Sequence, residues 1–314
     1  VSDRSARGYR RLRFWFGPVL RMFTAIMAQS ATDKRRLAAA GAEPSRIEVT
    51  GSFKFDVANR NPEKERAVAG FLSRHDAGRN RIVLLGGSTW PGEDAVLIGI
   101  FKRLCQRHRA LRLVLVPRHF EKADAVQAEI EKAGFACVRK SRESLRVLKC
   151  ESSKVLNLET GNRKRETEPE ITETSDFRPP AADLAVILAD TTGELMGFYG
   201  NADIVFVGKS LCAHGAQNMI EPCLCGAATL VGPYTENFRS VMSDLLDAAA
   251  LIQVPDAETL EREIGRLVVD AEARKTLGTR GVEAVLKRKG VVGRCAAAMA
   301  GQIMAHRESE SLLV

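Results

Sequence analysis

The sequence predicts an α/β protein built on a parallel β-sheet that helices cover on both faces. Short, almost uninterrupted apolar runs alternate with amphipathic segments along most of the chain, as strands buried on both faces of such a sheet require. Several of these runs end in glycine, hydroxyl and charged residues, at the position where open α/β sheets bind ligands. The 314 residues are also enough for about two domains.

The first 56 residues predict the end of a small α/β unit. Residues 24–28 and 47–50 are apolar runs that favour strands. Between them, Ser30 is suited to begin a helix and Gly41 to end it. This strand–helix–strand unit is too small for a domain, so we expect further residues before Val1.

Positive charge is concentrated at the start of the chain. Residues 1–21 contain six arginines and one aspartate, a net +5, which leaves +3 of the total +8 for the other 293 residues. This uneven distribution argues against a nucleic-acid-binding protein. Within this basic arm, apolar side chains recur at helical spacing, interrupted by Pro18: Leu12, Trp15, Phe16, Val19 and Phe23. They predict either a helix packed on its own domain or an interfacial helix that contacts anionic lipid headgroups.

From Arg81 onward the alternation of strands and helices resumes. The predicted strands are residues 82–85, 111–116, 185–188, 204–207 and 229–231, and the predicted helices are residues 93–107, 122–133, 193–199 and 218–225. One stretch breaks the pattern, because 18 of the 40 residues from Arg139 to Arg178 are charged. We expect a surface insertion there, with binding of a partner as the alternative.

Three loops that follow predicted strands carry residues suited to an anionic ligand: 86–93, 117–119 and 208–221. Glycines let backbone N–H groups approach an anion, and Arg118 can hold a phosphate by charge-assisted hydrogen bonds. Glu221 can accept hydrogen bonds from ribose hydroxyls. These loops together predict a nucleotide site. Neither the Walker pattern nor the dinucleotide fingerprint occurs, so the sequence favours neither ATP hydrolysis nor hydride transfer.

The cysteines do not predict a metal site. Cys212 and His214, like Cys223 and Cys225, are separated by one residue, whereas structural zinc sites have two to four residues between ligands. We therefore expect small buried side chains and no metal. The seven cysteines are an odd number without a signal peptide, which favours reduced thiols in the cytoplasm. No apolar run is long enough for a membrane-spanning helix.

The loops, in their order along the chain, resemble those of the transferases that attach 3-deoxy-D-manno-octulosonic acid (Kdo) to lipid A. The resemblance begins at VSDRS and covers most of the chain outside the charged insertion. Its main motifs are MAQSATDKRRLAAAGA, VTGSFKFD, GGSTWPGED, LVLVPRHFEKAD, ADTTGELMGFYGNADIVFVGKSL, GAQNMIEPCLCG and VGPYTENF. Together these motifs are highly specific.

This resemblance implies a GT-B glycosyltransferase without a cofactor, peripheral to the cytoplasmic face of the bacterial inner membrane. CMP-Kdo would be the donor and a lipid A precursor the acceptor, and the Arg4–Arg21 arm would contact the anionic membrane surface. The implied organisation is a C-terminal remnant of a second Rossmann-like domain, the acceptor domain (1–56), an interdomain linker (57–80), the donor-binding domain (81–290) and a C-terminal helix that crosses back to the first domain (291–314).

The resemblance also assigns residues to the donor site. The residues that match donor-binding motifs are Arg118, Thr192, Gly193, Glu194, Ser210, Gly215, Asn218 and Glu221, and further candidates are Lys54, Ser88, Thr89, Glu93 and Lys209. Two positions depart from the family pattern, because Lys209 and Ala216 stand where glycine is usual. Ala216 restricts the backbone if that position needs a positive φ, and Lys209 is a candidate for an additional phosphate contact.

The family's proposed catalytic base is a glutamate in a segment that would precede Val1, so no catalytic residue is assigned in this chain. We therefore expect the chain to bind donor better than it turns the donor over. The alternative is a non-catalytic, membrane-associated protein that binds a nucleotide sugar. Another GT-B enzyme, such as a sugar-nucleotide epimerase, fits the combined D-T-x-G-E and V-P-R-H loops less well.

Overall fold

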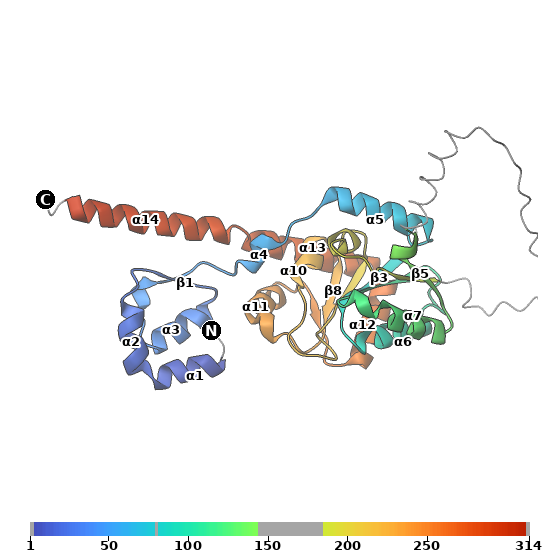
Figure 1. Cartoon of the computed structure of the whole chain (residues 1–314), viewed down its shortest axis with the longest axis horizontal. Coiled ribbons are helices and arrows are strands. Elements are labelled where there is room, and N and C mark those ends of the chain that lie inside the picture. The colour runs from blue at the N-terminus through green and yellow to red at the C-terminus, as the bar shows by residue number, and fades with distance from the viewer. Residues whose placement is uncertain (1–2, 79–80, 144–184, 312–314) are drawn as a thin grey trace, which may run out of the picture.

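The computed structural model describes residues 3–78, 81–143 and 185–311, and its main feature is a seven-stranded sheet (Figure 1). The strand order is β5-β6-β4-β3-β7-β8-β9, and all six pairings are parallel. The strands are β3 (Ile82–Thr89), β4 (Leu111–Pro117), β5 (Ala136–Arg139), β6 (Ala185–Leu188), β7 (Ile204–Val207), β8 (Ala228–Val231) and β9 (Ile252–Gln253). The predicted parallel α/β fold is confirmed.

Helices cover both faces of this sheet. One face packs against α5 (Pro62–Arg74), α9 (Leu195–Tyr199), α10 (Ile220–Leu224), α11 (Arg239–Asp247) and α13 (Ala271–Arg288); the other packs mainly against α6 (Glu93–Leu104), α7 (Ala123–Lys132) and α12 (Ala257–Val269). Within β3, Val83 and Leu85 belong to the first core cluster and Leu84 to the second. The two-residue alternation of a strand therefore places apolar side chains in both cores.

Residues 57–80, which the sequence suggested as a linker, contain the helix α5. Asn61 begins it by accepting a hydrogen bond from the backbone N–H of Lys64, and Pro62 is its first residue. Val68, Phe71 and Leu72 are buried in the main core. These three residues recur at helical spacing, and the turn-forming residues that precede them lie before α5 begins.

The first part of the chain forms a smaller unit, in which β1 (Ile26–Ala28) and β2 (Ile47–Val49) pair in parallel. Its helices are α1 (Asp3–Arg11), α2 (Arg13–Arg21) and α3 (Ala31–Ala39), followed by the single turn η1 (Pro44–Arg46). Gly17 and Gly41 let two segments approach closely, because a Cβ added at Gly41 would lie 2.7 Å from the Gly17 Cα. Trp15 of α2 is 70% exposed, and whether α2 meets a membrane or another part of the protein stays a prediction.

A polar joint connects residues 50–59 with the start of α14 (Val291–Ser311). The Asp56 carboxylate, from the short helix α4 (Lys54–Val57), accepts hydrogen bonds from the N–H groups of Gly290 (2.6 Å) and Val292 (2.7 Å). Arg294 donates to the Thr50 carbonyl oxygen at 3.0 Å. From this joint, α14 extends toward the side of the molecule where α1–α3 lie (Figure 1). That α14 crosses back to a first domain stays a prediction.

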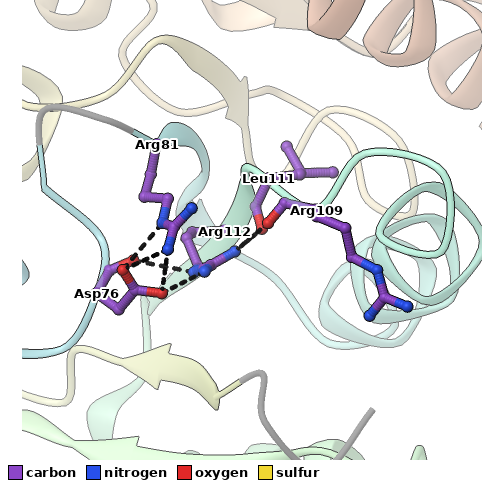
Figure 2. Close-up of polar contacts among 5 residues, drawn as sticks. All are labelled: Asp76, Arg81, Arg109, Leu111 and Arg112. Atoms are coloured by element: carbon purple, nitrogen blue, oxygen red, sulfur yellow. Dashed lines mark hydrogen bonds and ion pairs between the residues drawn. The ribbon is translucent and has the colours of Figure 1, made fainter. Parts of the chain in front are cut away.

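The buried Arg112 lies at the start of β4 and binds several backbone carbonyl groups around it (Figure 2). The Arg112 guanidinium donates to the carbonyl oxygens of Asp76 (2.9 Å), Arg109 (2.8 Å) and Leu111 (2.8 Å), and it also pairs with the Asp76 carboxylate. Arg81 reaches the same carboxylate through two hydrogen bonds of 2.9 Å. The connection between α5 and β3 is thereby tied to β4.

The structure bears on the predicted charged insertion and on the expected absence of a membrane-spanning helix. Of the predicted insertion at 139–178, Arg139 is the last residue of β5, residues 140–143 are helical, and the rest lies outside the described residues. None of the helices in the described ranges is both long enough and apolar enough to pass through a bilayer.

Candidate functional site

A pocket of about 290 Å³ lies at the carboxyl-terminal edge of the main sheet. It sits beside β3, whose two neighbours β4 and β7 lead to opposite halves of the sheet, and such switch points are the usual ligand sites of open α/β sheets. The residues that line it are Ser88, Arg118, Gly193, Leu195, Met196, Tyr199, Gln217, Asn218 and Glu221. Five of these were sequence-predicted site residues: Ser88, Arg118, Gly193, Asn218 and Glu221.

Arg118 supplies positive charge to the pocket. It follows β4 directly, and its backbone N–H donates to the Thr89 carbonyl oxygen at 3.0 Å, which fixes the strand ends relative to each other. The side chain is exposed. Among the described residues, none forms an ion pair with its guanidinium. A fork of N–H donors at the mouth of a pocket suits a phosphate group.

Asn218 and Glu221 form a polar pair on the pocket wall. The Asn218 side-chain amide donates to the Glu221 carboxylate at 3.0 Å, while its oxygen accepts from the Ile220 N–H at 3.1 Å. Burial raises the pKa of Glu221 above its ordinary value, although the hydrogen bond from Asn218 opposes this. A carboxylate held this way can accept hydrogen bonds from the adjacent hydroxyls of a sugar.

Two lysines that do not line the pocket hold the loop at 190–194 in place. The Lys64 ammonium donates to the Gly193 carbonyl oxygen at 2.7 Å, and Lys140 pairs with the Glu194 carboxylate at 2.6 Å. Burial works to raise the pKa of Glu194, but hydrogen bonds from Lys140 and Thr191 hold it below its ordinary value. Of the loop's three predicted site residues, Thr192 and Glu194 do not line the pocket, whereas Gly193 does.

Glu93 organises the loop that follows β7. Its carboxylate is fully buried and accepts hydrogen bonds from the backbone N–H groups of Trp90, Lys209, Ser210, Leu211 and Cys212, at 2.7 to 3.4 Å. The sequence suggested that backbone N–H groups of this loop would face a bound anion. Instead, a carboxylate of the protein itself occupies those donors.

Thr89 and Ser210 lie behind the pocket wall. The buried Thr89 hydroxyl donates to the Asp94 carboxylate at 2.6 Å. The Ser210 hydroxyl donates to the Val207 carbonyl oxygen at 2.5 Å and accepts from the Gly232 N–H at 2.8 Å. Both hydroxyls are satisfied by protein groups, so each has a structural role here.

Two residues of the loop that follows β7 have backbone angles that favour glycine. Lys209 and Ala216 have φ values of 57° and 54°, in the left-handed region that favours glycine. Gly215 (φ 110°) meets a second constraint, because a Cβ there would lie 2.4 Å from the Asn237 side-chain nitrogen. Lys209 and Ala216 therefore adopt a backbone conformation that glycine would adopt with less strain.

The two candidate lysines lie outside the pocket lining. Lys54 donates to the Asn237 carbonyl oxygen at 2.6 Å and lies 3.8 Å from the centre of the Phe238 ring. Partial burial lowers the pKa of Lys54. The Lys209 ammonium lies 4.7 Å from the centre of the Trp90 ring.

Four pocket residues were missed by sequence reasoning: Leu195, Met196, Tyr199 and Gln217. All four lie within the motifs of the family resemblance. Leu195, Met196 and Tyr199 belong to a predicted helix, where apolar residues favour the hydrophobic core over a ligand site. Tyr199 is fully buried, and burial first, then the nearby Glu221 carboxylate, raises its pKa well above the ordinary value. Gln217 is fixed by its own N–H, which donates to the Gly208 carbonyl oxygen at 3.0 Å.

The cysteines that were considered for a metal site lie in different surroundings. Cys223 is buried and its thiol lies 3.8 Å from the Ala250 carbonyl oxygen, whereas Cys212 is exposed. Burial raises the pKa of Cys223 to about 12. The described part of the chain contains no group of three His, Cys, Asp or Glu residues arranged to hold a metal ion.

Sequence comparisons relate the chain to one family. Residues 1–57 match the family model described as 3-deoxy-D-manno-octulosonic-acid transferase (kdotransferase). The chain is 34% identical to such a transferase from Bordetella pertussis over 82% of this chain and 53% of that protein. It is 28% identical to the Haemophilus influenzae enzyme over 94% of this chain and 60% of that protein. The chain therefore spans about half to three fifths of the curated relatives' length.

Solved structures show the same fold. The C-terminal CMP-Kdo binding domain of WaaA from Acinetobacter baumannii matches with a TM-score of 0.56 at 22% identity, over 72% of this chain and 99% of that domain. Anabaena Alr3699/HepE in complex with UDP matches with a TM-score of 0.52 at 13% identity, over 93% of this chain and 68% of that protein. These neighbours are GT-B glycosyltransferases, which confirms the expected fold class, and the sequence relatives confirm the resemblance to the Kdo transferases.

Proposed function

Because the sequence of this chain follows the Kdo transferases along most of its length, we propose that it forms the donor-binding part of a transferase that uses CMP-Kdo. The observation that carries the proposal is the pocket in which Arg118, Asn218 and Glu221 meet at the switch point of the sheet. A nucleotide consists of a phosphate group, a sugar with adjacent hydroxyls and a base with apolar faces, and this pocket offers a counterpart to each.

The roles follow from the chemistry of each side chain. Arg118 binds the phosphate of CMP through its guanidinium fork. Glu221, oriented by Asn218, accepts hydrogen bonds from the ribose hydroxyls. Leu195 and Met196 provide the apolar wall against which the nucleotide packs. Glu93 and Ser210 do not line the pocket. They fix the loop that carries Gln217 and Asn218.

The acceptor in this proposal is a lipid A precursor at the cytoplasmic face of the inner membrane. Support comes from the first part of the chain, where six arginines accompany exposed apolar side chains of α1 and α2. A basic helix with exposed aromatic residues is typical of proteins that lie on an anionic membrane surface. The chain would associate with the membrane peripherally.

Calorimetric titration with CMP tests the donor site. We expect Arg118→Ala to weaken CMP binding by about 1.5–3 kcal/mol, the scale of a charged hydrogen bond. Lys122→Ala is the matched control, because Lys122 is an exposed cation that follows the same strand without lining the pocket. Equal CMP affinity in the wild type and Arg118→Ala would remove Arg118 from the site.

A further inference from the structure

Three side chains stack across the carboxyl-terminal edge of the main sheet, next to the pocket proposed for CMP, the nucleotide pocket. They come from the loops after three adjacent strands: Lys209 after β7, Trp90 after β3 and His119 after β4. The Lys209 ammonium lies 4.7 Å from the centre of the Trp90 ring, and the His119 ring meets the Trp90 ring edge-on, with ring centres 4.8 Å apart. We call these three residues the Trp90 stack.

Hydrogen bonds hold the Trp90 stack in place from both sides. The backbone N–H groups of Trp90 and Lys209 donate to the same buried Glu93 carboxylate, at 2.8 and 2.7 Å. On the other side, the His119 Nδ1 lies 3.1 Å from the Glu121 carboxylate. The electron-rich face of an indole ring attracts an ammonium group. These contacts together restrict where the Lys209 ammonium lies.

Lys209 and Arg118 reach the end of β3 from opposite sides. From the β4 side, the Arg118 N–H donates to the Thr89 carbonyl oxygen at 3.0 Å. From the β7 side, Gly208 packs so closely that a Cβ there would lie 2.2 Å from the Ser88 carbonyl oxygen, and Lys209 is the next residue. Ser88 and Arg118 both line the nucleotide pocket. Two cations therefore flank the strand end at which this pocket opens.

The Lys209 ammonium has hydrogen-bonding capacity left for a ligand. It carries three N–H donors, and within the described part of the chain no carboxylate pairs with it. The carboxylates that contact the stack have other partners, because Glu93 accepts from backbone N–H groups and Glu121 pairs with His119. Lys209 is also only partly exposed. A partly buried ammonium without a carboxylate partner is suited to an anionic group of a ligand in the adjoining pocket.

We infer that Lys209 binds the carboxylate of the donor sugar, beside the phosphate that Arg118 binds. This inference rests on the proposed function, because the carboxylate belongs to Kdo. Kdo is an ulosonic acid, so the anomeric carbon that carries the phosphate oxygen also carries the carboxylate, and the two anionic groups lie close together. The guanidinium fork of Arg118 suits phosphate oxygens, whereas the Lys209 ammonium is a compact point charge. Lys209 thereby selects donors whose sugar is acidic.

The test measures the binding of three ligands to the full chain by calorimetry. The ligands are CMP, a CMP-Kdo analogue in which a methylene group replaces the glycosidic oxygen and prevents hydrolysis, and the methyl ester of that analogue. Lys209→Met removes the ammonium but keeps a long side chain and a non-glycine backbone, and Lys209→Arg restores the positive charge. Lys122→Met is the matched control, because Lys122 is an exposed cation that follows β4 without lining the pocket.

We expect the wild type to bind the acid about tenfold more tightly than the ester, the effect of one charged hydrogen bond. Lys209→Met should lose this preference while its affinity for CMP stays unchanged. Lys209→Arg and Lys122→Met should keep the preference.

Three results would overturn the inference: equal binding of acid and ester by the wild type, a preference that Lys209→Met retains, or an equal loss of affinity for all three ligands in Lys209→Met. The last result would place the ammonium on the phosphate instead. In each of these cases the wild type still binds CMP through Arg118, so the donor site stands. A wild type that does not bind CMP would contradict the proposed function itself, and with it the role of Lys209.

Discussion

The Glu93 carboxylate shows how one buried residue can fix a loop that borders the pocket. It accepts hydrogen bonds from four consecutive backbone N–H groups, those of residues 209–212. The same loop closes on itself, because the N–H groups of Ala216 and Gln217 donate to the carbonyl oxygens of Lys209 (2.8 Å) and Gly208 (3.0 Å). The position of Gln217 in the pocket therefore depends on Glu93.

Replacing Glu93 by glutamine tests this positioning role. Glutamine keeps one acceptor oxygen but turns an amide donor toward backbone N–H donors, so we expect a loss of stability of about 2 kcal/mol and weaker CMP binding. Thermal unfolding and calorimetry measure the two effects. Glu236→Gln is the control, because Glu236 pairs with His214 of the same loop from the exposed side. Wild-type stability in Glu93→Gln would contradict the role.

Asp94 makes stability depend on pH. Burial raises the pKa of this carboxyl to about 6, although the Thr89 hydroxyl opposes the change. The folded protein then binds a proton more tightly than the unfolded chain, so stability falls as pH rises from about 4 to about 6 and levels off above that. The difference corresponds to roughly 3 kcal/mol. Asp94→Asn should remove this dependence while keeping the Thr89 hydrogen bond.

Chemical denaturation of the wild type and Asp94→Asn, measured between pH 4 and pH 7.5, checks this expectation. Other groups titrate in the same range, so the informative quantity is the difference between the two proteins at each pH. The stability advantage of Asp94→Asn should grow as pH rises to about 6. An advantage that is constant across the range would mean that Asp94 does not titrate there.

For single residues, the sequence predicted which side chains suit a ligand, but not which of them line the pocket. Arg118, Asn218 and Glu221 were identified from residue type and motif, and the pocket contains all three. Ser210 and Glu93 occur in equally suggestive motifs, yet both are fully buried and bonded to the backbone. Which side of a loop a side chain occupies depends on long-range packing, and no local pattern specifies it.

At the scale of secondary structure, the apolar strands were predictable because burial on both faces leaves an uninterrupted hydrophobic signal. The residues at which strands and helices begin and end were harder to predict. The strand expected at 82–85 continues to Thr89 as β3, because Gly86 and Gly87 pair with β4 despite having no side chain to pack. A Cβ at Gly87 would lie 2.5 Å from the Tyr199 hydroxyl, so these glycines serve close packing rather than a turn.

The buried arginine of β4 gives a prediction about how elements are joined. Arg112→Met should destabilise the protein by about 3 kcal/mol, because it leaves carbonyl oxygens of Asp76, Arg109 and Leu111 without their donor. Arg81→Met is the matched control. It removes a more exposed pair to the same Asp76 carboxylate and should cost less than about 1 kcal/mol. Equal losses of stability in denaturant unfolding would show that Arg112 acts only as a surface charge.

At the scale of the whole molecule, the polar joint around Asp56 relates α14 to the rest of the chain. The sequence predicted a terminal helix but could not reveal its cap, because Asp56 is more than 230 residues away from the N–H groups that it accepts. Such a contact exists only after the chain has folded.

Removal of this cap should loosen α14 while leaving the main sheet intact. Loss of an N-cap costs about 1 kcal/mol, so Asp56→Ala should increase tryptic cleavage at Arg294 about fivefold. Asp256→Ala is the control, because Asp256 caps a different helix, α12, through a local hydrogen bond from the Thr259 N–H at 2.7 Å. A cleavage rate at Arg294 that does not change would mean that other contacts hold the start of α14.

The carboxylate inside the 209–212 loop has a consequence for the thermodynamics of ligand binding. A loop whose amides are already satisfied is ordered before any ligand arrives, so its conformational entropy is lost during folding and not again on association. Those four amides should exchange slowly with deuterated solvent in the free protein, with protection that changes little when a ligand binds. The nucleotide pocket would then behave as a rigid receptor, whose selectivity comes from the shape and charge that folding has already fixed.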